Sequence, residues 1–264
     1  MIGIFDSGLG GLTALKELKE ILPGEDLVYF GDTGRVPYGT KSRETIVRYA
    51  LQDVRFLRGF SPEAILVACG TVSSGAMKEL RESFDFPIIG VVEATARSAA
   101  NVTKNGKIGV IGTSATIRSG SYTTQLKKIN PDLEITEKAC PLFVSLVESG
   151  FITDGDEVTR LTCERYLAPI REAGCDTLIL GCTHYPIIAH EISKALPGVA
   201  LISSGKEGAL MLREILEKNE LKGRGNGKIN YYVSDDPEGF SQNAHIFLGD
   251  NIGGDVKVVD IEKY

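Results

Sequence analysis

The segment LILGCTHYP, residues 178–186, ends an apolar run with Gly181 and then places Cys182, Thr183 and His184 side by side. A buried cysteine by itself packs as a small hydrophobe. Here a thiol, a hydroxyl and an imidazole follow one another at the point where a strand should end. Together these groups can bind a polar ligand or move a proton.

A second cysteine stands in a matching position. The segment ILVACGT, residues 65–71, is also an apolar run, and it ends in Cys69 and Thr71. Two thiols on opposite walls of a cleft suit the inversion of a carbon stereocentre, in which a base removes a proton from one face and an acid delivers one to the other. Cysteine can serve in both roles, because its reference pKa is about 8.5 and its surroundings can lower it. Either cysteine alone fits an inert core thiol, but the pair favours a function.

The segments around these residues predict parallel β-sheets covered by helices. Short apolar runs alternate with longer amphipathic segments along the whole chain, as in βαβ units. The predicted strands are IGIF, LVYFG, AILVAC, PIIGVV, KIGVIG, LEITEKAC, TLILGC, VALISS and KINYYV, and the clearest predicted helices are residues 11–22, 42–59 and 207–219. Ligands bind beyond the carboxyl ends of the strands in such sheets, so we expect the side chains there to share one site.

Further polar groups follow the predicted strands. The glycine-flanked loops at residues 6–11 and 112–121 offer N–H groups and hydroxyls that suit a carboxylate, although tight β-to-α connections explain their glycines equally well. Asp6 and His184 could orient or activate a thiol. Alternatively, Asp6 could cap the following helix and His184 could be a structural histidine. Glu148 lies in an apolar helix, where a lone acid most often faces solvent.

An internal repeat indicates two related halves. IGIFDSG at residues 2–8 matches IGVIGTS at residues 108–114 with an offset of 106 (108 minus 2), and the two cysteine-ended runs match with an offset of 113 (182 minus 69). We predict an α/β fold of two pseudo-symmetric lobes, each a parallel-type sheet flanked by helices, with the active site in the cleft between them. Residues 1–97 with the returning C-terminal residues 208–264 would form the first lobe, and residues 98–207 the second.

Composition limits the classes of function. The chain has 264 residues, 42% of them apolar, which is enough for an ordinary core. Five cysteines without disulfide-like spacing, and a start without a secretory pattern, predict a cytoplasmic protein with reduced thiols. The absence of a long apolar run argues against a membrane protein, and the dispersed net charge of −6 argues against a nucleic-acid partner. The glycine-rich, charged segment 221–228 predicts a surface loop.

No cofactor or metal is expected either. The three histidines are scattered and the chain has no CxxC motif, so there is no metal signature. GLGGL lacks the full glycine spacing of a dinucleotide-binding turn.

As a set, these motifs resemble the glutamate racemases, cofactor-independent two-thiol enzymes that make D-glutamate for peptidoglycan. The resemblance covers nearly the whole chain, through GIFDSGLGGLTALKE, YFGDTGRVPYGTKS, VACGT, IGVIGTSATIRSGSY, ACPLFVSLVESG, LILGCTHYP and YYVSDDPEGF. It implies two α/β lobes with the substrate, L- or D-glutamate, held in the cleft, and a homodimer as the usual assembly.

The resemblance also implies roles for individual residues. Cys69 matches the thiol that takes the proton from D-glutamate, and Cys182 the thiol that takes it from L-glutamate. Asp6 and His184 match auxiliary groups beside those thiols, and Glu148 matches a further acid near the second. The positions implied to hold the substrate are Ser7, Pro37, Tyr38, Gly39, Gly70, Thr71, Thr113, Thr116 and Thr183.

Residue 70 departs from the family pattern. The family's first thiol is normally followed by an asparagine that contacts the substrate, and this chain has Gly70. Glycine removes a polar side chain from the cleft and widens the backbone options. Three consequences stay open: a water takes the place of the amide, affinity falls, or the preferred substrate differs.

The leading hypothesis is a glutamate racemase in which one thiolate deprotonates Cα and the other thiol reprotonates it. The alternatives are a racemase of another acidic amino acid such as aspartate, an amino-acid-binding homologue impaired by Gly70, and a hydrolase with a Cys182–His184 nucleophile. A binding protein gains nothing from paired thiols, and a hydrolase would leave Cys69 unexplained.

Overall fold

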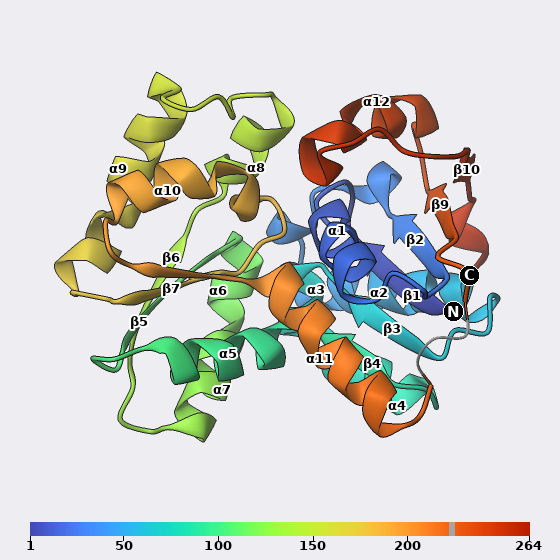
Figure 1. Cartoon of the computed structure of the whole chain (residues 1–264), viewed down its shortest axis with the longest axis horizontal. Helices are drawn as coiled ribbons and strands as arrows, with labels where there is room; N and C mark the ends of the chain where they lie inside the picture. Colours follow the sequence, from blue (N-terminus) through green and yellow to red (C-terminus); the bar gives the residue numbers. More distant parts are fainter. Residues whose placement is uncertain (222–224) are drawn as a thin grey trace.

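The computed structural model, which describes residues 1–221 and 225–264, contains two parallel sheets with helices around each (Figure 1). The strands of the first sheet are β1 (Ile2–Asp6), β2 (Leu27–Gly31), β3 (Ala64–Val67), β4 (Ile88–Gly90), β9 (Ile229–Val233) and β10 (Val256–Val258). Those of the second are β5 (Lys107–Gly112), β6 (Glu134–Ala139), β7 (Thr177–Leu180) and β8 (Ala200–Ser203). Their spatial orders are β10-β9-β2-β1-β3-β4 and β6-β5-β7-β8, and every neighbouring pair is parallel.

Helices connect these strands. They are α1 (Leu12–Ile21), α2 (Arg43–Arg58), α3 (Gly70–Gly75), α4 (Met77–Ser83), α5 (Val91–Val102), α6 (Ser114–Ser119), α7 (Ser121–Ile129), α8 (Leu142–Glu148), α9 (Glu157–Glu172), α10 (Ala189–Ala195), α11 (Ser204–Lys218) and α12 (Pro237–Leu248). The short 3₁₀ turns are η1 (Thr33–Arg35), η2 (Tyr38–Thr40), η3 (Tyr185–Ile188) and η4 (Ile261–Lys263). Local signals set several helix starts: the Ser42 hydroxyl caps α2 by accepting the N–H of Thr45 at 3.3 Å.

The strand orders confirm the two-lobe fold. The first sheet contains β2-β1-β3-β4 and the second repeats this arrangement as β6-β5-β7-β8, so β3 and β7, which precede the two cysteines, occupy equivalent places. In Figure 1 the second sheet and its helices lie on the left and the first on the right. The C-terminal strands return to the first sheet, where β9 pairs with the free edge of β2.

Two helices join the lobes where the predicted boundaries fall. Residue 97 lies in α5 and residue 208 lies in α11, and these helices pack against each other. Helix α11 contacts β4 of the first sheet as well as β8 of the second, and it runs along the junction in Figure 1. The division into residues 1–97 with 208–264, and 98–207, therefore stays a prediction.

The core is continuous between the lobes. Every residue of β1, β2, β3 and β7 is buried, as expected for parallel strands covered on both faces. One apolar cluster includes Leu15 and Tyr29 from the first lobe together with Ile111 and Leu180 from the second. This packing holds the carboxyl ends of the strands in fixed relative positions.

Three details differ from the sequence-based expectations or lie beyond them. The predicted strand PIIGVV ends at Gly90, and Val91 begins a helix whose Val92 and Ala96 pack in the second lobe. A short apolar run fits either element, which explains the error. Strand β10 was not predicted, and residues 222–224 of the predicted loop 221–228 lie outside the described residues. Within the described residues, no helix has both the length and the apolar character needed to cross a membrane.

Candidate active site

The carboxyl ends of the central strands meet at a cavity of about 450 Å³ that both lobes line. Residues after β1 and β3 form one side, and residues after β5 and β7 form the other. The predicted site residues that line it are Ser7, Pro37, Tyr38, Gly39, Cys69, Gly70, Thr71, Thr113, Glu148, Cys182, Thr183 and His184. Asp6 and Thr116 do not line the cavity but lie buried behind it.

Cys69 stands on the wall of the first lobe, at the residue that precedes α3. Its Sγ lies 3.5 Å from Oγ of Ser7, and the side chain is buried. Burial and the nearby carboxylate of Asp6 raise the pKa of Cys69 to about 12, although Ser7 and the N–H of Val72 act in the opposite direction. In the free site Cys69 is therefore a protonated thiol, suited to donate a proton.

Cys182 stands on the opposite wall, beside a histidine. Its Sγ lies 3.8 Å from Nδ1 of His184, whose Nε2 lies 2.8 Å from Oε1 of Glu148. Burial alone would lower the pKa of His184, but hydrogen bonds and charge interactions with Cys182 and Glu148 raise it to about 10. The imidazole is therefore protonated at neutral pH, and its positive charge lies next to the sulfur of Cys182.

Asp6 lies buried behind the cavity, where its charge interacts with Cys69 on one wall and with His184 on the other. Its carboxylate accepts the N–H of Gly8 at 3.2 Å, and burial raises its pKa, although the charge of His184 and nearby backbone N–H groups oppose that rise. Gly11 is the residue that precedes α1, and it has no side chain to cap that helix. The Asp6 carboxylate accepts backbone N–H groups of Ser7, Gly8 and Gly11, so it bonds to the turn that leads into α1 without occupying the cap position itself.

Threonine hydroxyls connect the two lobes at the cavity. Oγ1 of Thr71 in the first lobe lies 2.9 Å from Oγ1 of Thr113 in the second. Thr113 is also the cap of α6, where its hydroxyl accepts the N–H of Thr116 at 3.2 Å. Thr116 thus orients Thr113 from a buried position, and the two lining hydroxyls face a space where a carboxylate could bind.

A buried polar network holds the loop that carries Pro37, Tyr38 and Gly39. The Tyr38 hydroxyl donates to Asp32 and lies 3.2 Å from Oδ2 of Asp53. Arg35 pairs with both acids, through Nε to Asp32 at 2.6 Å and Nη2 to Asp53 at 2.8 Å. Neither Arg35 nor Asp53 is among the residues predicted from the sequence, although an acid on the apolar face of the predicted helix 42–59 is a visible signal.

Helix α8 contributes lining residues that were also missed. Pro141, Val144 and Ser145 line the cavity beside Glu148. Their spacing of three and four residues places them on one face of a helix. Once Glu148 is a candidate, this spacing would have identified them from the sequence.

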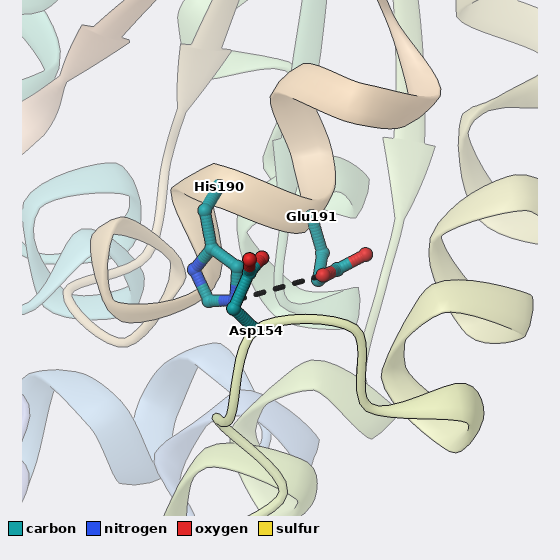
Figure 2. A group of neighbouring side chains, drawn as sticks. All are labelled: Asp154, His190 and Glu191. Atoms are coloured by element: carbon teal, nitrogen blue, oxygen red, sulfur yellow. Dashed lines mark ion pairs between the residues drawn. The ribbon is translucent and has the colours of Figure 1, made fainter.

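A cluster of possible metal ligands lies elsewhere, at the start of α10. Figure 2 shows Asp154, from the segment between α8 and α9, close to His190 and Glu191. Lys194 already pairs with both acids, with its Nζ 2.8 Å from Oε1 of Glu191 and also bonded to Asp154. Because this ammonium supplies the positive charge between the carboxylates, the cluster is explained as an ion-pair network.

We expect Glu148→Gln to shift the pH dependence of any acid–base reaction at Cys182. Glu148 helps to raise the pKa of His184, so the variant should lose the imidazolium at lower pH. The alkaline limb of the kcat/KM profile should then move to lower pH by about one pH unit. Glu172→Gln, at an exposed acid that ends α9, is the matched control and should leave the profile unchanged. An unshifted limb in Glu148→Gln would contradict this assignment.

Comparisons with known proteins agree with this geometry. Residues 8–212 match the model of the Asp/Glu/hydantoin racemase family. Glutamate racemase from Geobacter metallireducens is 49% identical, over 99% of this chain and 97% of its own length. The crystal structure of glutamate racemase from Francisella tularensis in complex with D-glutamate has a TM-score of 0.92 and 40% identity, covering 100% of this chain and 98% of that chain. Glutamate racemase from Thermus thermophilus in complex with β-chloro-D-alanine has a TM-score of 0.89 and 42% identity, with the same coverage.

Proposed function

Because the chain belongs to the Asp/Glu/hydantoin racemase family, we propose that it interconverts L- and D-glutamate by a two-thiol acid–base mechanism without a cofactor. The observation that carries the proposal is the placement of the thiols. Cys69 and Cys182 come from equivalent strand ends of different lobes, and both line one cavity. A substrate held between them presents one face of its Cα to each sulfur.

The electrostatics of the two walls support a direction for each proton. From L-glutamate, the sulfur of Cys182 takes the Cα proton while the thiol of Cys69 donates a proton to the opposite face. Cys182 then holds a thiol and Cys69 a thiolate, so conversion of D-glutamate runs through the same steps in reverse. The protonated His184 beside Cys182 and the high pKa of Cys69 fit the start of the L-to-D direction.

Positioning supplies the rest of the rate enhancement. General acid–base catalysis is worth about 10²–10⁴-fold, and a proton next to a carboxylate is only weakly acidic. The reaction therefore needs donors that stabilise the charge developing at the carboxylate. We assign this role to the hydroxyls of Thr71 and Thr113 and to N–H groups of the loop after β1, all at the cavity or its edge.

Glutamate is favoured over aspartate because the near-full-length relatives described above are glutamate racemases. The test is to incubate the purified chain separately with both enantiomers of glutamate and of aspartate, with a chelator and no added cofactor, and to measure chirality over time. We expect an equal mixture of the two glutamate enantiomers, whether the reaction starts from L- or from D-glutamate. Turnover of aspartate should be much slower. Faster aspartate turnover would overturn the substrate assignment, and tight glutamate binding without turnover would indicate a binding protein.

The wider biological setting is part of the same proposal. We place the protein in the cytoplasm as a homodimer that supplies D-glutamate for peptidoglycan synthesis. The five cysteines are all free, which fits a reducing compartment. The dimer and the peptidoglycan role are supported by the family resemblance, and analytical ultracentrifugation would test the former.

A further inference from the structure

Gly70 lies against the backbone of the opposite lobe. Gly70 begins α3 directly after Cys69, and Gly181 directly precedes Cys182. A Cβ atom added to Gly70 would overlap the carbonyl oxygen of Gly181, and it would lie 3.2 Å from the carbonyl carbon and 3.8 Å from Cα of Cys182. The atoms in the way belong to the main chain, so no side-chain rotation would relieve the overlap.

Two other residues of the first lobe contact the segment that follows Cys182. A Cβ atom on Gly10 would overlap Oγ1 of Thr183 and lie 2.6 Å from Nδ1 of His184. The hydroxyl of Thr13 donates to the carbonyl of Thr183 at 3.0 Å. The segment around Cys182 therefore packs directly against the first lobe.

We propose that Gly70 is a positioning residue for the reaction: the lack of a side chain lets the Gly181 carbonyl rest against the start of α3, and this contact sets the separation of the two thiol walls. The proposal rests on the proposed function, because the separation matters only if both thiols act on one Cα. It also gives the departure at residue 70 a structural reason. The space next to Cα of Gly70 is filled by the other lobe.

Backbone strain does not explain the glycine. Gly70 is helical and its φ does not lie in the left-handed region. Alanine favours a helix more than glycine does, so on local grounds Gly70→Ala should stabilise α3. Any loss in that variant must come from the contact with Gly181.

The test compares alanine at the two ends of α3. In Gly70→Ala the lobes must separate at Gly181, whereas a Cβ on Gly75 would only touch Cγ2 of Ile46 at 4.0 Å. Misplacement of reacting groups by about 1 Å can cost about 10²-fold, so we expect kcat for glutamate to fall about ten- to a hundredfold in Gly70→Ala. The primary deuterium isotope effect at Cα should rise as well, because proton transfer becomes slower relative to the other steps. Gly75→Ala should stay within about twofold of wild type.

The outcomes separate this inference from the proposed function. A wild-type protein without glutamate racemisation refutes the function itself. If wild type is active, Gly70→Ala activity similar to that of Gly75→Ala overturns the inference. A loss without a change in isotope effect, or one that disappears when normalised to folded protein by circular dichroism, overturns it too. Gly70→Asn should be at least as impaired as Gly70→Ala, and a faster Gly70→Asn variant would contradict the proposal.

Discussion

Serine in place of either Cys69 or Cys182 should stop racemisation, with kcat falling by about 10²–10⁴-fold in both directions. Each thiol is buried on its own wall of the cavity, and in the proposed mechanism each serves once as base and once as acid. Serine keeps the shape of the side chain but is a far weaker acid than a thiol. Circular dichroism and chiral analysis of glutamate turnover would measure folding and activity on the same samples.

The matched control for these variants is Cys175→Ser. Cys175 is also a buried free cysteine, but it lies outside the cavity and has Thr136 as a hydrogen-bond partner, which serine can retain. Its activity should stay close to that of wild type. Wild-type turnover in Cys69→Ser or in Cys182→Ser would refute the two-thiol mechanism.

Arg35→Met should lower the free energy of unfolding by about 3–5 kcal/mol. Arg35 is 10% exposed and pairs with Asp32 and Asp53, whose side chains are fully buried. Methionine keeps much of the volume but leaves two buried carboxylates without their cation. The Tyr38 hydroxyl bonds to the same two acids, so the loop of residues 37–39 that lines the cavity should become less ordered. The KM for glutamate should rise as a result. Urea unfolding followed by fluorescence would measure the change.

The loss of unfolding free energy in Arg35→Met should be smaller at low pH than at high pH. Burial and Asp32 already raise the pKa of Asp53, and the loss of Arg35 removes a charge that lowers it. A carboxyl with a raised folded-state pKa favours folding at low pH and loses that contribution as pH rises. The variant should therefore recover stability, relative to wild type, as the pH falls from 8 to 5.

Arg43→Met makes the same substitution in an exposed ion pair with Glu79. Such pairs are worth about 0–1 kcal/mol, so this control should unfold almost like wild type. Equal effects in the two variants would show that the buried network around Arg35 has no special role in stability.

The sequence predicted the fold well where the pattern was local and repeated. The alternation of apolar runs and amphipathic segments predicted the parallel sheets, and the repeat that pairs residues 2–8 with 108–114 predicted the equivalent lobes. The start of α5 at Val91 was missed because an apolar run of that length fits a strand or a helix. Strand β10 was missed because three residues carry too little pattern.

The candidate site was predictable only in part, for a physical reason. The polar residues after β1, β3, β5 and β7 could be grouped because parallel strands end at one edge of a sheet. The ion pairs of Arg35 and the approach of Gly181 to Gly70 join segments that are distant in sequence or lie in different lobes. No local periodicity encodes such contacts, so they emerge only from the folded chain.

Proton exchange in D₂O would show whether two thiols act on opposite faces of one Cα. The purified protein would receive L-glutamate or D-glutamate without any cofactor, and NMR with chiral separation would follow deuterium at Cα of both enantiomers at early times. With two thiols, the newly formed enantiomer should carry deuterium from the start while the remaining substrate keeps its proton, in both directions. Deuterium entering substrate and product at equal initial rates would show a single shared base, and the absence of exchange in either enantiomer would show that no racemisation occurs.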